Sequence, residues 1–193
     1  MEEDKIRNIS LLLIGGSAGS LEVLIAVLPQ LKPLQNWAMV IVLHRKSTDD
    51  SLLENLIAMK TVIPVKEIED KTPLEAGFIY VVPSDYHLLF EKNGLLSLDV
   101  SDKVNYSRPS IDVVFESAAD VFGSRATAVL LSGANADGTQ GLLAIQQMGG
   151  TVVIQDPDSA EMPYMPKFAI NKMTANHLVD ADGLVAFINN LGF

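Results

Sequence analysis

The sequence predicts a protein of the α/β class, built on a mostly parallel sheet. Continuous apolar runs of strand length alternate with segments of helical periodicity, and a glycine-rich turn joins the first run to the first helical segment. An Asn-Gly pair marks a hairpin in the middle of the chain. The 193 residues are enough for one domain with a full-sized core. We therefore expect a single domain over residues 1–193.

The N-terminal part predicts a strand, a helix and a second strand. Residues 9–14 form a continuous apolar run, typical of a strand covered on both faces, and a glycine-rich turn ends it. Apolar residues at helical spacing follow in 21–28, and a second buried-strand run covers 38–43. This order indicates a βαβ unit with a parallel strand pair. The next helix is expected to begin with a capping box formed by Ser51 and Glu54.

The middle of the chain has an antiparallel pattern. Short strand-like runs occur at 78–82, 86–91 and 95–100. Asn93-Gly94, between the last two runs, favours a two-residue hairpin because both positions tolerate a positive φ. We expect these three runs to form an antiparallel insertion or edge.

The C-terminal half returns to alternating helices and strands. The expected elements are a helix over 111–122 capped by Ser110, a strand over 126–131, a helix after Gly138 with Leu142, Ile145 and Met148 inward, a strand over 151–155, a late strand at 178–179 and a closing helix over 184–191. His87 and His177 fall within strand patterns, so we interpret both as structural residues. No internal repeat or linker interrupts the pattern.

Composition excludes several classes of protein. Lys and Arg number 14 and Asp and Glu 24, giving a net charge of −10 that argues against nucleic-acid binding. A 48% apolar content excludes a disordered chain, and the lack of cysteine excludes disulfides, thiolate metal sites and a cysteine nucleophile. Three histidines without ligand spacing predict no metal site. No apolar run reaches membrane-spanning length, so we expect a cytoplasmic protein without membrane insertion.

Three chemically useful side chains follow predicted parallel strands. Ser17 comes directly after the first strand, His44 after the second, and Asp137 in the loop after the strand at 126–131. Ligands of open parallel sheets bind outside the carboxyl ends of the strands, so these residues are expected at one edge. A serine needs a base to become a nucleophile, and a carboxylate can orient a histidine for that task. The set therefore predicts acyl transfer.

Residues 15–19 match Gly-x-Ser-x-Gly, the sharp turn that exposes a nucleophilic serine. The N–H groups at the start of the next helix, that of Ala18 among them, would face this turn and favour an oxyanion. The alternative is a structural or phosphate-binding turn. A dinucleotide fingerprint needs a further glycine and an acidic residue about 20 positions later, and this strand ends in His44-Arg45-Lys46 instead. For Asp137, the alternative role is the N-cap of the helix after it.

These residues resemble the catalytic domain of the CheB-type chemotaxis protein-glutamate methylesterases. The resemblance runs from about Ile9 to Asn190. The segments that carry it are Ile14-Gly15-Gly16-Ser17-Ala18-Gly19, Val42-Leu43-His44, Tyr80-Val81-Val82-Pro83 with Asp85 to His87, Arg108-Pro109-Ser110-Ile111-Asp112, and Leu131-Ser132-Gly133 with Asp137-Gly138 and Gly141-Leu142. Their order and spacing together are specific. The resemblance implies a doubly wound sheet with helices on both faces and a small antiparallel appendage.

The family hydrolyses methyl esters of glutamate side chains on bacterial chemoreceptors, and some members also deamidate receptor glutamines. The resemblance places the nucleophile on Ser17, the base on His44 and the orienting carboxylate on Asp137, and it implies no cofactor. The implied reaction runs through an acyl-enzyme and releases methanol. The alternatives are another serine esterase, a receptor glutamine deamidase, or a non-catalytic signalling adaptor that kept the fold.

The chain departs from the family pattern in the loop before Asp137. Members usually have a methionine whose backbone binds the oxyanion, and Ala134 stands there, so its N–H is the expected donor. Asn135-Ala136 replaces a common Gly-Asn pair, and Leu43 stands where a glutamine often precedes the histidine. Many members also carry an N-terminal receiver domain. About eight residues precede the first strand here, so we expect no receiver domain.

The partner that the resemblance implies is the helical cytoplasmic region of methyl-accepting chemotaxis receptors. That region is often acidic, so bulk charge would repel this chain, with its net charge of −10. Local basic residues must then bind the receptor. Arg45, Lys46 and Arg108 are the candidates for pairing with receptor carboxylates, and the alternative is that they are simply solvated.

Overall fold

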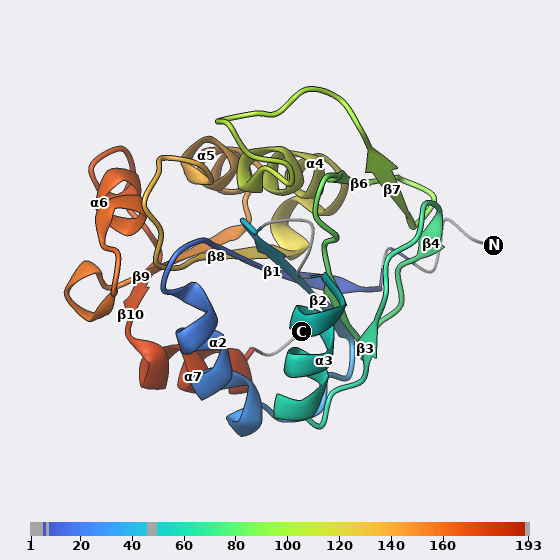
Figure 1. Cartoon of the computed structure of the whole chain (residues 1–193), viewed down its shortest axis with the longest axis horizontal. Coiled ribbons are helices and arrows are strands. Elements are labelled where there is room, and N and C mark those ends of the chain that lie inside the picture. Colours follow the sequence, from blue (N-terminus) through green and yellow to red (C-terminus); the bar gives the residue numbers. More distant parts are fainter. Residues whose placement is uncertain (1–5, 7, 46–49, 192–193) are drawn as a thin grey trace.

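A seven-stranded sheet runs through the centre of the molecule (Figure 1). The computed structural model describes residues 6, 8–45 and 50–191. The strand order is β10-β9-β8-β1-β2-β5-β3, and every neighbouring pair is parallel. The strands are β1 (Ser10–Gly16), β2 (Trp37–Leu43), β3 (Val65–Lys66), β5 (Ile79–Val81), β8 (Ala126–Leu130), β9 (Thr151–Gln155) and β10 (His177–Val179).

Helices cover both faces of this sheet, which confirms the doubly wound class (Figure 1). The helices are α2 (Ser20–Val27), α3 (Asp50–Lys60), α4 (Ile111–Phe122), α5 (Thr139–Gln147), α6 (Tyr164–Ile170) and α7 (Ala181–Asn189). Leu24, Ile57 and Leu184 anchor α2, α3 and α7 on one face. Phe115 and Met165 belong to the core on the other face, which α4, α5 and α6 cover. None of the helices in the described part of the chain is long and apolar enough to span a membrane.

The chain reverses its direction of travel across the sheet at β1. The first half builds outward from β1 through β2 towards β5 and β3, and the second half builds from β8 on the other side of β1. The carboxyl ends of β1, β2 and β8 therefore lie side by side at the point of reversal. Ligands of open α/β sheets bind at this place, because the loops diverge there and leave a crevice.

The antiparallel appendage is smaller than the sequence predicts. It contains β4 (Thr72–Pro73), β7 (Leu95–Asp99) and β6 (His87–Phe90). The prediction for 78–82 was wrong, because β5 is fully buried and pairs parallel with β2 in the large sheet. The hairpin between β6 and β7 exists, but the Gly94 N–H donates to the Glu91 carbonyl. Of the Asn93-Gly94 pair, only Gly94 has a positive φ, which is 88°. Its loop therefore has three residues rather than two.

Two smaller expectations also change. The helix after Gly138 begins at Thr139, and Met148, expected inward, is 48% exposed because it lies just past the end of α5. Ser51 lies in the first turn of α3 rather than before it, because the helix begins at Asp50. The sequence also gave no signal for α6, which is only seven residues long.

Candidate active site

The neighbours of β1 place Ser17 between the two other candidate residues. On one side, β2 pairs with β1 in register, and the His44 N–H donates to the Gly16 carbonyl at 3.2 Å. On the other side, the Ser17 N–H donates to the carbonyl of Ser132, which follows β8, at 2.9 Å. The parallel pairing thus brings together loops that lie about 30 and more than 100 residues apart in the sequence.

The small residues around Ser17 allow two loops to approach closely. Gly19 has a φ of 79°, and a Cβ there would lie 2.7 Å from the Ser132 hydroxyl. A Cβ at Gly133 would lie 3.1 Å from the Ser17 Cβ. A side chain at Gly19 would thus be strained and would force the loop after β8 away from Ser17.

His44 contacts Asp137 directly. The His44 Nε2 atom lies 2.7 Å from the Asp137 Oδ2 atom. The His44 side chain is 10% exposed, whereas that of Asp137 is fully buried. Since an ionised carboxylate only accepts hydrogen bonds, Nε2 carries the proton and Nδ1 of the neutral ring is left as the acceptor. The atom of His44 that can take a proton is therefore Nδ1.

The Asp137 carboxylate also accepts hydrogen bonds from the N-terminal end of helix α4. Its carboxylate accepts from the N–H groups of Ile111 (2.6 Å) and Asp112 (3.1 Å) and from the Ser110 hydroxyl (2.9 Å). The positive end of the helix dipole favours a negative charge at this place. The predicted alternative, a cap on α5, was wrong: Gly138 occupies that N-cap position, and no side chain caps α5.

The two buried carboxyl groups beside α4 have opposite pKa shifts. Burial would raise the pKa of Asp137, but hydrogen bonds from His44, Asn105 and the backbone outweigh it and hold the pKa at about 2. For Asp112, burial and the charge of Asp137 raise the pKa to about 6, against the hydrogen bond from the Gly141 N–H. Asp137 therefore stays charged in the mildly acidic range in which Asp112 takes up a proton.

The raised pKa of Asp112 makes folding stability depend on pH. The folded chain holds this proton up to about pH 6, whereas an unfolded aspartate releases it near about pH 3.9. The folded state binds more protons in between, so the free energy of unfolding falls as the pH rises from about 4 to 6. The Asp112→Asn variant lacks this titration. As the pH rises from about 4 to 7, we expect its free energy of unfolding to increase by roughly 1 to 3 kcal/mol relative to that of the parent chain.

Urea unfolding at a series of pH values measures this change. Asp120→Asn, which alters an exposed carboxylate on the same helix, is the matched control and should follow the parent chain. Parallel stability curves for Asp112→Asn and the parent chain would contradict the prediction.

Ser17 and His44 line one cavity of about 280 Å³. No hydrogen bond joins these two described residues in the structure. The remaining wall is mostly apolar and consists of Ser20, Leu21, Leu43, Arg45, Leu52, Leu53 and Leu56. Catalytic hydrogen bonds are often long or absent before substrate binds. Ser17 and His44 therefore border the same space, although no hydrogen bond joins them.

Within the described part of the chain, two exposed residues near Ser17 have backbone N–H groups without a protein acceptor: Ala18 follows Ser17, and Ala134 follows Gly133, which lies close to the Ser17 Cβ. The N–H of Gly133, by contrast, donates to the Met162 carbonyl at 3.0 Å. Free N–H groups next to a nucleophile can stabilise the oxyanion of a tetrahedral intermediate. Together with the hydroxyl, imidazole and carboxylate, they give the groups that acyl transfer needs.

The three candidate docking residues have different environments. The Arg45 Nη2 atom donates to the Val82 carbonyl at 3.0 Å, and the side chain lies on the wall of the cavity that contains Ser17. Lys46 lies outside the described residues. Arg108 Nη1 donates to the carbonyls of Val100 and Ser101, at 2.9 and 2.8 Å. Arg108 therefore ties together the two ends of the loop before α4, and these contacts support a structural role.

The sequence did not reveal two polar residues that contact this site. Asn105 donates through Nδ2 to Asp137 (2.9 Å) and to Asp112 (2.8 Å). Asn135 Nδ2 lies 3.2 Å from His44 Nδ1. Both lie in loops where no periodicity indicates an orientation. The unusual Asn135-Ala136 pair was a visible signal for one of them.

His87, interpreted as structural, supports the same helix start. Its Nδ1 accepts from the Ser110 N–H at 3.1 Å, and its Nε2 lies 3.0 Å from the Asp102 carbonyl. The ring is completely buried. It therefore links β6 to the loop before α4 and lies outside the cavity.

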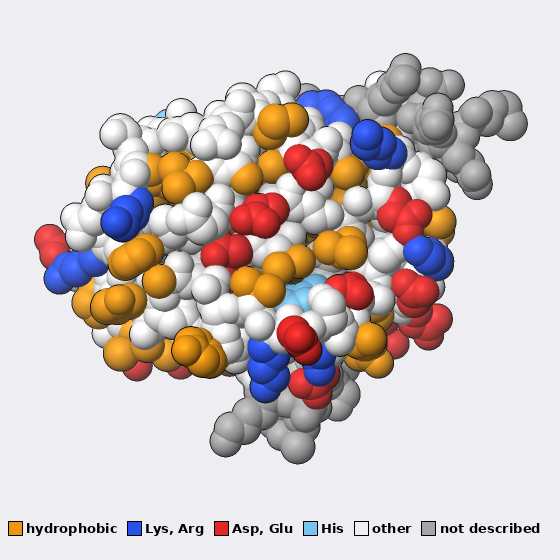
Figure 2. Space-filling model, turned by 90° about the horizontal axis from the view of Figure 1, so that it is seen from above, with side chains coloured by type: hydrophobic (Ala, Val, Ile, Leu, Met, Phe, Trp, Pro, Cys, Tyr) orange, Lys and Arg blue, Asp and Glu red, His pale blue; other side chains and the backbone are white. Residues whose placement is uncertain are grey.

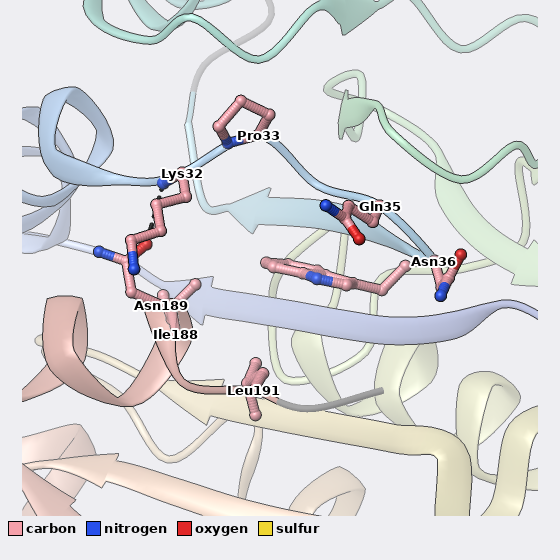
Figure 3. A pocket seen from close by; sticks show the side chains of 8 residues that line it. Lys32, Pro33, Gln35, Asn36, Ile188, Asn189 and Leu191 are labelled. Carbon is pink, nitrogen blue, oxygen red and sulfur yellow. Dashed lines mark hydrogen bonds between the residues drawn. The ribbon is translucent and has the colours of Figure 1, made fainter.

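A larger cavity, of about 500 Å³, lies at the opposite end of β2 (Figure 3). Its wall is formed by Lys32, Pro33, Gln35, Asn36 and Trp37 before and at the start of β2, and by Ile188, Asn189 and Leu191 at the end of α7. It contains no nucleophile paired with a base. Within the described part of the chain, no group of three His, Cys, Asp or Glu side chains could hold a metal ion.

Comparison with known proteins gives the family. A family model described as CheB methylesterase matches residues 12–188. A Leptospira interrogans relative is 38% identical over 175 residues, and the match covers 91% of each chain. A Thermotoga maritima relative named protein-glutamate methylesterase/protein-glutamine glutaminase is 33% identical over 174 residues. That match covers 89% of this chain and 51% of the relative, so the chain spans about half of that protein.

A solved structure agrees with the sequence comparison. The fold superposes on the crystal structure of the Thermotoga maritima CheB methylesterase catalytic domain with a TM-score of 0.88 and 31% identity. The superposition covers 95% of this chain and 98% of that domain. Family model, sequence relatives and fold point to the same group. The chain belongs to the CheB methylesterase family.

Proposed function

We propose that this protein hydrolyses methyl esters of glutamate side chains on chemotaxis receptors, with Ser17 as nucleophile, His44 as base and Asp137 as orienting carboxylate. The observation that carries the proposal is that His44, which lines the cavity together with Ser17, contacts the buried, charged Asp137 at 2.7 Å. The name of the Thermotoga maritima relative, protein-glutamate methylesterase/protein-glutamine glutaminase, supports the substrate class.

In the first half of the proposed reaction, Ser17 Oγ attacks the ester carbonyl carbon while His44 Nδ1 takes the hydroxyl proton. The carbonyl oxygen becomes an oxyanion, and the N–H groups of Ala18 and Ala134 stabilise it. The intermediate then collapses, the bond to the methoxy oxygen breaks, and the proton on Nδ1 leaves with methanol. The product is an ester between Ser17 and the glutamyl γ-carbonyl.

In the second half, water attacks this acyl-enzyme and gives its proton to His44 Nδ1. The second tetrahedral intermediate collapses to a γ-carboxylic acid while the proton on Nδ1 returns to Ser17 Oγ, and the acid then releases its own proton to solvent. Asp137 holds the ring through Nε2 in both halves and stabilises the imidazolium that forms. No step in this sequence uses a metal or an organic cofactor.

A second candidate activity is deamidation of receptor glutamines. The paired names of the relatives, methylesterase and glutaminase, favour it. The steps are the same, except that ammonia leaves instead of methanol. The test of the proposed function is to incubate the chain with methylated receptor fragments and with fragments carrying glutamine at the same positions. Methanol release supports the esterase, and ammonia release supports the deamidase. The absence of both products would overturn both activities.

The charge distribution restricts where an acidic receptor can dock. On the face shown in Figure 2, acidic side chains lie among hydrophobic ones near the middle, and Lys and Arg side chains lie towards the borders. Glu116 and Asp120 on α4 are exposed. Arg45, by contrast, lines the cavity beside Ser17. We therefore propose that Arg45, which also donates to the Val82 carbonyl, pairs together with Lys46 with receptor carboxylates near the ester; Arg108 does not line this cavity and is left out of the docking proposal.

Charge reversal at Arg45 tests this docking. We expect Arg45→Glu to raise KM about tenfold or more at low salt and to change kcat little, because lost long-range attraction acts on association. Lys32→Glu makes the same change in net charge at the opposite end of β2 and is the matched control. Steady-state methanol release gives both constants. An unchanged KM in Arg45→Glu would argue against the docking role.

A further inference from the structure

The Asn135 side chain contacts His44 Nδ1, the nitrogen that acts as the base in the proposed reaction. In the structure, His44 Nε2 contacts Asp137 at 2.7 Å, and His44 Nδ1 lies 3.2 Å from the Asn135 side-chain nitrogen. The ring is thus held at both nitrogens. Ser17, on the wall of the same cavity, forms no hydrogen bond with this ring in the described structure.

The orientation of the Asn135 amide is determined by its second contact. Its Oδ1 accepts from the Asp137 N–H at 3.1 Å, which closes a short turn within the loop. The Nδ2 group, a donor only, is thereby directed at His44 Nδ1. Since Nε2 carries the proton of the neutral ring, Nδ1 accepts this hydrogen bond.

We propose that Asn135 is a positioning residue that holds His44 in its neutral, base-competent form by donating to Nδ1. The proposal rests on the proposed function only in naming His44 as the base; the hydrogen bond itself is independent of turnover. A protonated Nδ1 would direct its hydrogen at the Asn135 NH₂ group, so the contact opposes protonation of the ring. The Ser17 hydroxyl can donate to the same nitrogen only after the hydrogen bond from Asn135 breaks.

The charged groups around His44 do not change when Asn135 is replaced. Asp137 contacts the ring, Asp112 on α4 lies behind Asp137, and Arg45 is the next residue in the chain. The segment after β1 contributes Ser17, and the described part of α3 that faces the cavity contributes leucine side chains. A shift in the titration of His44 in a neutral Asn135 variant therefore reports the loss of the amide.

Two neutral variants separate the donor from the turn. Asn135→Ala removes both contacts, whereas Asn135→Ser keeps an oxygen that can accept from the Asp137 N–H but cannot reach His44. Asn190→Ala, on the exposed side chain at the end of α7, is the control. The measurement is the NMR titration of the His44 ring in the full chain, made in the Ser17→Ala background so that it needs no activity.

We expect the midpoint of the His44 titration to rise by about half to one pH unit in both Asn135 variants, the size of one hydrogen bond. An unchanged midpoint in both would overturn the proposal. A rise in Asn135→Ala alone would also overturn it, because the turn rather than the donor would then be responsible. With Ser17 restored, the acid limb of kcat/KM should move by the same amount. A midpoint that moves in a chain without turnover would support the Asn135 contact and overturn the proposed function instead.

Discussion

The Ser17→Ala variant is expected to release no measurable methanol from methylated receptor fragments. Loss of a serine nucleophile removes the covalent route completely, and such losses amount to about a millionfold in kcat. The fold should be unaffected, because the Ser17 side chain forms no hydrogen bond within the described part of the chain and alanine keeps the Cβ that lies close to Gly133. Methanol assays and thermal unfolding of both chains test the two halves of this expectation.

Ser124→Ala is the matched control for this variant. Ser124 is exposed in the short turn between α4 and the start of β8, at the opposite end of that strand from the site, and its loss should leave turnover unchanged. Undiminished turnover in Ser17→Ala would refute Ser17 as the nucleophile. A parent chain that neither turns over substrate nor reacts with a fluorophosphonate would favour a non-catalytic adaptor with the same fold.

The Asp137→Asn variant is expected to lose about a thousand- to ten-thousandfold in kcat. Asp137 Oδ2 lies 2.7 Å from His44 Nε2 and 2.6 Å from the Ile111 N–H. An amide NH₂ at that position would oppose both donors. In the other orientation, the NH₂ would oppose the Ser110 hydroxyl and the Asn105 side chain, which contact Oδ1. His44 therefore loses either its correct protonation or its orientation.

Stability has to be measured beside activity for Asp137→Asn. Unpaired buried donors cost about 1 to 3 kcal/mol each, so the melting temperature should fall as well. Asp180→Asn is the control, because Asp180 caps α7 through the Gly183 N–H and lies outside the site. Since asparagine and aspartate are about equally good N-caps, Asp180→Asn should change stability little and leave kcat unchanged. Near-normal kcat of folded Asp137→Asn would show that the carboxylate does not orient the base.

Local patterns were sufficient for the elements that carry the site. The apolar runs that became β1, β2 and β8 read as buried strands because both faces of a parallel sheet are covered. The turn at 15–19 could be predicted from its run of small residues, because only small residues allow that backbone path. The same patterns were insufficient for β5, since a short apolar run does not indicate which strand it will pair with.

The role of Asp137 shows the same limit at the level of one side chain. Its position before α5 suggested a cap on that helix, because capping is the common local use of an aspartate. The carboxylate instead accepts from the start of α4, 25 to 27 residues earlier in the chain. The packing of α4 against α5 decides this choice, and that packing is a long-range property.

The sequence by itself determined the α/β class, the succession of the main strands along the chain and the three strand-end residues Ser17, His44 and Asp137. These follow from hydrophobic periodicity and turn chemistry, which act over a few neighbouring residues. Only the tertiary structure decided that α4 presents its N–H groups to Asp137 and that Asn135 lies against His44 Nδ1. Contacts between loops of different strands depend on how all the elements pack together, and no local pattern encodes their distances.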